Sequence, residues 1–220
     1  MKKVWLVLLM IAITMTSCFE VIEEITLNDD GSGKVSMTVN ISRSKTKLKS
    51  IMLMDSINNY KVPSESDIRS NMAKMVAEIG KIDGVSNVSN NLDFEDFIFT
   101  VSCDFRDVDV LNNVITHFST DGEKQALQKN KQFSYDTFRK VFVRNYHYNL
   151  ADEIHRLKQQ DQEVLDEASI TTLYRFNSLV ESSTNTHARV AGNKKAVMLK
   201  IGASDMISNK KNIKNTITLQ

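Results

Sequence analysis

Segments of alternating apolar and polar residues, joined by short turn sequences, constrain the fold of this chain most strongly. Glu20 to Leu27 alternates in this way, and Lys34 to Ile41 alternates again, with Val, Met, Val and Ile at every second position. Between them, Asn28 to Gly33 is built from Asn, Asp, Ser and Gly, which suit tight turns. The pattern predicts a β-hairpin, and the loop lacks the spaced acidic ligands and distal glutamate of an EF-hand calcium site.

The rest of the chain mixes strand and helix patterns. Strands are predicted at 85–88, 94–105, 170–176, 195–201 and 215–219, with a polar turn at 89–93. Helical spacing is found at 46–58, after a cap at Ser64 or Ser66 through Ile82, after Asp107 through Phe118, at 152–167 and near 204–208. A polar loop is predicted at 120–131, while 133–148 fits both a helix stripe and a strand face. We therefore expect an α+β fold: a mainly antiparallel sheet of hairpins with helices packed on one face.

The first residues have the layout of a secretion signal. Lys2 and Lys3 precede a ten-residue apolar run, Val4 to Ile13, which ends at Thr14. A membrane-spanning helix needs about 20 apolar residues. The run is roughly half as long, so residues 1 to 17 are predicted to be a signal peptide.

The segment Met15-Thr16-Ser17-Cys18 resembles the lipobox of bacterial lipoproteins, in the looser form found in the Bacteroidota. The resemblance implies cleavage before Cys18 and two or three acyl chains, palmitate among them, on this cysteine. Several chains hold a protein stably on a membrane. We expect a cell-envelope location, with the outer membrane favoured over the inner because Phe19 is not the aspartate associated with inner-membrane retention. A plain secretory peptide or an uncleaved anchor are the alternatives.

Both ends of the chain also resemble LppM-like envelope lipoproteins. At the start, Cys18 is followed by a strand, the turn Asp30-Gly31-Ser32-Gly33 and a second strand. Near the end, Thr172 to Phe176 is followed by Val180, Asn185 and Lys195 to Leu199. Residues 44 to 168 are largely unmatched. The resemblance implies an α+β envelope domain without established catalysis, and it transfers no functional residue.

Composition narrows the domain organisation and the partners. Residues 18 to 220 are predicted to form a single α+β lipoprotein domain, with two subdomains, 19–120 and 132–220, as an alternative. Without Lys2 and Lys3, 26 of the 28 basic residues face 27 acidic ones, so nucleic acid is not an expected partner. If lipid occupies Cys18, only Cys103 remains, so no disulfide is expected. Cys103 lies in a strand pattern, which predicts a small buried apolar residue.

The sequence contains no group of residues with the pattern of a known active site. The four histidines are scattered, without an HExxH motif, and neither a G-x-S-x-G nor an S-x-x-K motif is present. We therefore expect no catalytic residue, no metal site and no cofactor. The candidate binding patch lies in the aromatic and basic segment and consists of Phe138, Arg139, Phe142, Arg144 and Tyr146, although the same residues also fit a core stripe with a solvated edge.

Two hypotheses follow. The first is a membrane-anchored, non-catalytic envelope lipoprotein that binds a partner protein or serves an assembly role. The second is a carrier of lipid or another hydrophobic ligand, because methionines such as Met72 and Met75 could line an adaptable cavity. An enzyme is a distant third. An enclosed apolar cavity beneath the helices would favour the carrier, and a solid core with an exposed aromatic patch would favour partner binding.

Overall fold

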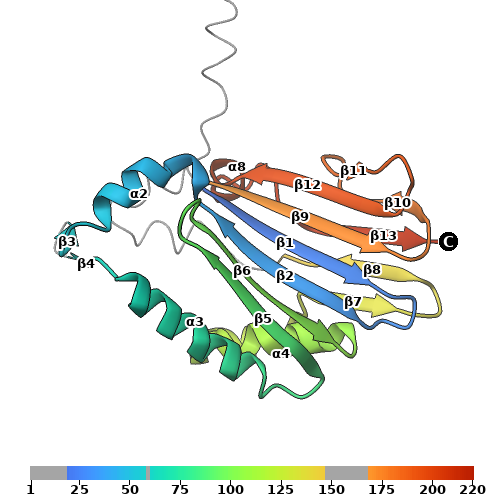
Figure 1. Ribbon diagram of the computed structural model, residues 1–220. Coiled ribbons are helices and arrows are strands. Elements are labelled where there is room, and N and C mark those ends of the chain that lie inside the picture. Colours follow the sequence, from blue (N-terminus) through green and yellow to red (C-terminus); the bar gives the residue numbers. More distant parts are fainter. Residues whose placement is uncertain (1–18, 58–59, 147–167) are drawn as a thin grey trace, which may run out of the picture.

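The protein is described by a computed structural model that covers residues 19–57, 60–146 and 168–220 (Figure 1). The predicted signal peptide, Cys18 and the helix predicted at 152–167 lie outside these residues. Within them, no helix combines the length and the apolar character that a membrane crossing requires.

The N-terminal hairpin forms as predicted. β1 (Glu20–Leu27) pairs antiparallel with β2 (Gly33–Asn40), with Ile25 opposite Val35. In the turn, the Asn28 amide donates to the Ser32 carbonyl oxygen, 2.8 Å away. Gly31 has a φ of +88°, a conformation that a glycine adopts without strain.

A seven-stranded sheet organises the molecule. Its strand order is β11 (Arg189–Val190), β12 (Ala196–Gly202), β9 (Ser169–Phe176), β1, β2, β6 (Ile98–Phe105) and β5 (Val85–Asp93). All neighbours are antiparallel except β1 and β9, which run parallel. The earlier strands, β1, β2, β6 and β5, lie together, and β1 pairs with β9 of the later part, so the ranges 19–120 and 132–220 share one sheet.

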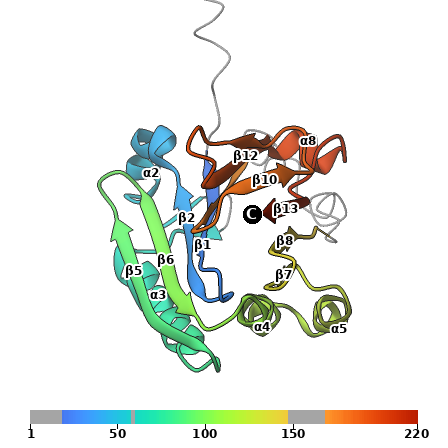
Figure 2. The same cartoon turned by 90° about the vertical axis from the view of Figure 1, so that its right-hand side faces the viewer.

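A second, four-stranded sheet covers part of the large one. It consists of β10 (Val180–Ser183), β13 (Asn215–Leu219), β8 (Val141–Arg144) and β7 (Phe133–Asp136), and Figure 2 shows it facing the large sheet. Side chains from both sheets form the main core, among them Ile25, Leu27, Phe105, Phe142, Phe176 and Ile217. A third pairing joins β3 (Ser56–Ile57) to β4 (Tyr60–Lys61).

The helices begin at residues that the sequence marks as caps. The Ser64 hydroxyl and the Asp67 carboxylate form a reciprocal capping box at the start of α3 (Glu65–Ile79), and the Asp107 carboxylate caps α4 (Val108–Phe118). α3 packs on β5, and His117 of α4 lies 3.5 Å from Glu78 of α3, which places the two helices side by side. The other helices within the described residues are η1 (Ser42–Ser44), α2 (Lys45–Ile51), α5 (Asp121–Lys129) and α8 (Ala203–Ile207). The α+β prediction is confirmed.

Three local predictions were wrong. The segment 120–131 is not a loop, because Thr120 and Glu123 form a second capping box that starts α5. The polar residues at 89–93 belong to β5, an edge strand whose polar side chains are solvated; the turn follows at 94–97, where the Asp93 carboxylate accepts the Glu95 and Asp96 amides. The helix predicted at 46–58 ends at Ile51, ahead of β3.

The two faces of the large sheet differ in character. One face carries Val21, Ile25, Val35, Met37, Val101 and Cys103, while the other carries polar pairs such as Thr38 with Thr100 and Glu24 with Arg175. Such a division is typical of an antiparallel sheet with one face packed and one face in water. The apolar face, called here the inner face, is the one that the small sheet and the helices cover.

Candidate ligand cavity

The small sheet leaves part of the inner face open, and a cavity of about 650 Å³ lies there. This volume falls within the range of about 300–1,000 Å³ that small-molecule sites occupy. The lining residues come from the large sheet, α3, α4, α5, the edge of the small sheet and α8. Most of them are apolar.

The floor of the cavity is built from four adjacent strands of the large sheet. The antiparallel register sets Val35 opposite Cys103 and Met37 opposite Val101, and β1 and β9 add Val21 and Ile170. Because alternate residues of a strand share a face, this floor was encoded in the hydrophobic alternation of the sequence.

Cys103 behaves as the sequence predicts. Its side chain is buried, and burial, followed by the charge of Asp104, raises the pKa of its thiol. A thiol held in its protonated form is a poor nucleophile. Cys103 therefore contributes apolar surface to the cavity wall rather than reactivity.

Helices form the opposite wall. α4 presents Leu111, Val114 and Ile115, and α5 adds Ala126 and Leu127. Leu111 and Ile115 belong to the helical stripe predicted from their spacing. The amphipathic face of α4 is thus divided between the main core and the cavity.

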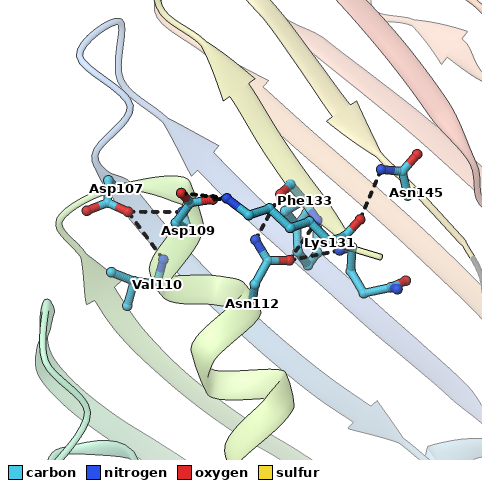
Figure 3. A network of polar contacts seen from close by, with 8 residues as sticks. Asp107, Asp109, Val110, Asn112, Lys131, Phe133 and Asn145 are labelled. Carbon is cyan, nitrogen blue, oxygen red and sulfur yellow. Dashed lines mark hydrogen bonds and ion pairs between the residues drawn. The ribbon is translucent and has the colours of Figure 1, made fainter. Parts of the chain in front are cut away.

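A buried carboxamide holds α4 beside β7 (Figure 3). The Asn112 Oδ1 atom accepts the backbone amides of Gln132 and Phe133 at 2.8 and 3.0 Å, and its Nδ2 atom donates to the Phe133 carbonyl oxygen at 2.9 Å. At the same junction, Lys131 forms an ion pair with Asp109 at 2.9 Å. These bonds fix Phe133, a cavity-lining residue, against the helix.

A buried ion pair stands where the main core meets the cavity. Arg144 donates from Nε to Glu23 Oε1 at 3.0 Å and from Nη2 to Oε2 at 2.9 Å. The two residues are only 8% and 7% exposed. Burial opposes the charge on Arg144, but Glu23 and Tyr174 together outweigh it and keep the pKa of the guanidinium raised. Both residues line the cavity, so its wall carries a fixed pair of opposite charges.

On the side that faces the main core, both members of the ion pair have further contacts. The Tyr174 hydroxyl donates to Glu23 Oε1 at 2.5 Å, and the Arg144 guanidinium lies 4.4 Å from the centre of the Phe133 ring. Complete burial, and then the Glu23 charge, raise the pKa of the Tyr174 phenol well above its usual value. The phenol therefore remains a hydrogen-bond donor to Glu23 at physiological pH.

The five residues of the candidate binding patch do not form one exposed surface. Phe142 is fully buried in the main core and Arg144 is buried in the ion pair, whereas Phe138 is 99% exposed between β7 and β8. Arg139, beside Phe138, is also exposed, and Tyr146 lines the cavity. The hairpin β7–β8 explains the difference, because its pleat sends Phe142 and Arg144 inward while Phe138 lies on the connecting turn.

Glu23 is the site residue that the sequence analysis missed. Its signal was present, since a charged residue stands on the apolar side of a strand between Val21 and Ile25. Among the side chains that the structure describes, no three His, Cys, Asp or Glu residues are grouped so as to hold a metal ion. Two of the four histidines, His147 and His155, lie outside the described ranges.

Comparison with known proteins gives one structural neighbour of note. No protein-family model and no curated protein matches the chain. The NMR structure of the folded domain of LppM from Mycobacterium tuberculosis is similar over 93% of this chain and 91% of that chain, at 12% sequence identity and a TM-score of 0.42.

Proposed function

We propose that this protein is a lipid-anchored, non-catalytic lipoprotein of the cell envelope that binds a hydrophobic ligand in the cavity. The single observation that carries the proposal is the apolar cavity of about 650 Å³ between the inner face of the large sheet and the helices. Each methylene group that a ligand buries there contributes about 0.8 kcal/mol. An acyl chain of about a dozen methylenes would gain roughly 10 kcal/mol, before the cost of association is subtracted.

The position of the cavity supports an exchange of ligand with a membrane. Val21 lines the cavity and stands three residues after Cys18, the proposed site of acylation. An extended chain spans at most about 3.6 Å per residue, so an acyl anchor on Cys18 would lie within about 11 Å of Val21 in the cavity wall. An anchor on Cys18 would therefore keep the cavity close to the lipid surface.

The test is binding of a neutral apolar fluorophore, N-phenyl-1-naphthylamine, by protein carrying Cys18→Ser, which has no acyl chain of its own. Val101→Trp places an indole into the cavity from its floor. Thr100→Trp is the matched control, because the neighbouring residue of β6 points to the opposite, polar face. We expect saturable fluorescence enhancement in the parent and in Thr100→Trp, and its loss in Val101→Trp. Equal enhancement in all three proteins would contradict binding in the cavity.

A second candidate function is docking of a partner protein through the turn between β7 and β8. Phe138 is 99% exposed there, and an aromatic ring with neighbouring cations is typical of interface anchors. A photo-crosslinking amino acid at position 138 should capture one specific envelope protein in cells. The same probe at position 129, an exposed residue of α5, should not. Identical crosslinks from both positions would argue against this candidate.

A further inference from the structure

The polar groups on the cavity wall restrict the head group of the ligand. The guanidinium of arginine carries five N–H bonds. Arg144 uses four of them, two toward Glu23, one toward Gln132 Oε1 at 3.3 Å and one toward the Asn145 carbonyl oxygen at 2.6 Å. Arg144 also has a side-chain hydrogen bond with Tyr174, so its donors are engaged within the protein.

Glu23, in contrast, retains acceptor capacity. Its Oε1 atom accepts from Arg144 and from Tyr174, whereas Oε2 accepts only the Nη2 bond of Arg144 within the described part of the chain. A carboxylate oxygen can accept two hydrogen bonds. Within the described contacts, the unused acceptor capacity therefore belongs to Oε2, the atom that accepts from Nη2.

The pair as a whole is electrically neutral, and this decides which head groups it tolerates. An anionic head drawn to Arg144 would be placed next to the Glu23 carboxylate, and a cationic head drawn to Glu23 would be placed next to Arg144. In a buried, apolar environment such like-charge approaches are strongly unfavourable. A neutral hydroxyl or amide head avoids both, since it can donate a hydrogen bond to Oε2 without bringing a charge.

We infer that the cavity takes a neutral amphiphile, with a hydroxyl or amide head at the Glu23–Arg144 pair and an aliphatic tail along Val101 and Leu111. This inference rests on the proposed function and adds the chemical class of the ligand. The Glu23–Arg144 pair disfavours the charged heads of free fatty acids and alkylamines.

Oleyl alcohol, oleate and oleylamine test this directly, because they share one hydrocarbon chain and differ in head charge. Each is titrated against the cavity-bound naphthylamine fluorophore at neutral pH, using the Cys18→Ser protein. We expect oleyl alcohol to displace the probe at least about tenfold more tightly than either charged analogue, the ratio given by 1.4 kcal/mol. Oleate or oleylamine binding as well as the alcohol would overturn the inference while leaving the proposed function intact. Failure of all three to displace the probe would overturn the proposed function itself.

A substitution tests the role of the ion pair. Glu23→Gln removes the negative charge and leaves Arg144 as an unpaired cation, so oleate should gain at least about tenfold relative to oleyl alcohol. The matched control is Glu24→Gln, which removes a carboxylate from the opposite face of the same strand and should leave the order unchanged. An unchanged order in folded Glu23→Gln would contradict selection by the ion pair. If that variant does not fold, the comparison of the three ligands on the parent protein still decides the inference.

Discussion

Removing the Arg144 side chain tests the ion pair that divides the core from the cavity. Arg144→Met leaves the Glu23 carboxylate buried, with the Tyr174 hydroxyl as its remaining donor among the described residues. Breaking a buried pair by removing one partner costs about 3–5 kcal/mol. For a chain of this size 1 kcal/mol corresponds to about 2–4 °C, so the midpoint of thermal unfolding should fall by roughly 6–20 °C.

The double variant Glu23→Gln/Arg144→Met separates the pair from the packing around it. It contains no buried charge, and glutamine still accepts the Tyr174 hydroxyl, so its stability should return to within about 1 kcal/mol of the parent. The control is Lys45→Met, which breaks an ion pair with Asp96 of similar length, 2.9 Å, whose side chains are about half exposed. That change should cost less than about 1 kcal/mol. Urea denaturation followed by circular dichroism measures all three. If Arg144→Met costs no more than Lys45→Met, or if the double variant is no more stable than Arg144→Met, the ion pair does not have this role.

Four further predictions follow from the described contacts. In the Cys18→Ser protein, Cys103 is the remaining thiol. Because it is buried, it should react with a disulfide reagent at least about tenfold more slowly than in the unfolded chain. Oleyl alcohol should slow the reaction further, and the absorbance of the released thiol measures both rates. The pKa of Tyr174 is higher in the folded than in the unfolded protein, so the neutral phenol contributes its full stability below about pH 10. This contribution is lost as the pH rises through the folded-state pKa. Tyr174→Phe should therefore make the free energy of unfolding, measured by urea titration, less dependent on alkaline pH. Asn112→Leu leaves two backbone amides and a carbonyl of β7 unpaired and should cost at least about 2 kcal/mol in the same assay. Gly84→Ala should cost about 1–3 kcal/mol of unfolding free energy, because Gly84 has a φ of +83° and an added Cβ would lie 2.6 Å from Val110 Cγ2.

Local patterns in the sequence predict many of the elements. The N-terminal hairpin, α3 with its Ser64 cap, α4 with its Asp107 cap and the strands near 170, 196 and 215 all lie where alternation, helical spacing and capping residues indicate. These features depend on a residue and its near neighbours, which is why they can be read from a chain. α5 was missed because Gly122 and a polar composition obscure a capping box that the structure forms.

Long-range pairing could not be predicted in the same way. The parallel pairing of β1 with β9 joins residues about 150 positions apart, and the sequence of neither strand specifies which strand it pairs with. The same holds for Glu23 and Arg144, which are separated by 121 positions. A single charged residue on the apolar side of β1 signals a buried partner, but the identity of that partner depends on how the small sheet packs. The cavity likewise results from the incomplete cover that this packing leaves on the inner face.

Native mass spectrometry after exposure to lipid shows whether the cavity holds a ligand. The Cys18→Ser protein is incubated with vesicles of total bacterial lipid, separated from them and measured without detergent, beside its Val101→Trp and Thr100→Trp variants. The account predicts one non-covalently bound lipid per chain in the parent and in Thr100→Trp, and none in Val101→Trp. Protein that emerges without lipid, or that carries it equally in all three forms, would contradict the claim that the cavity is a ligand-binding site.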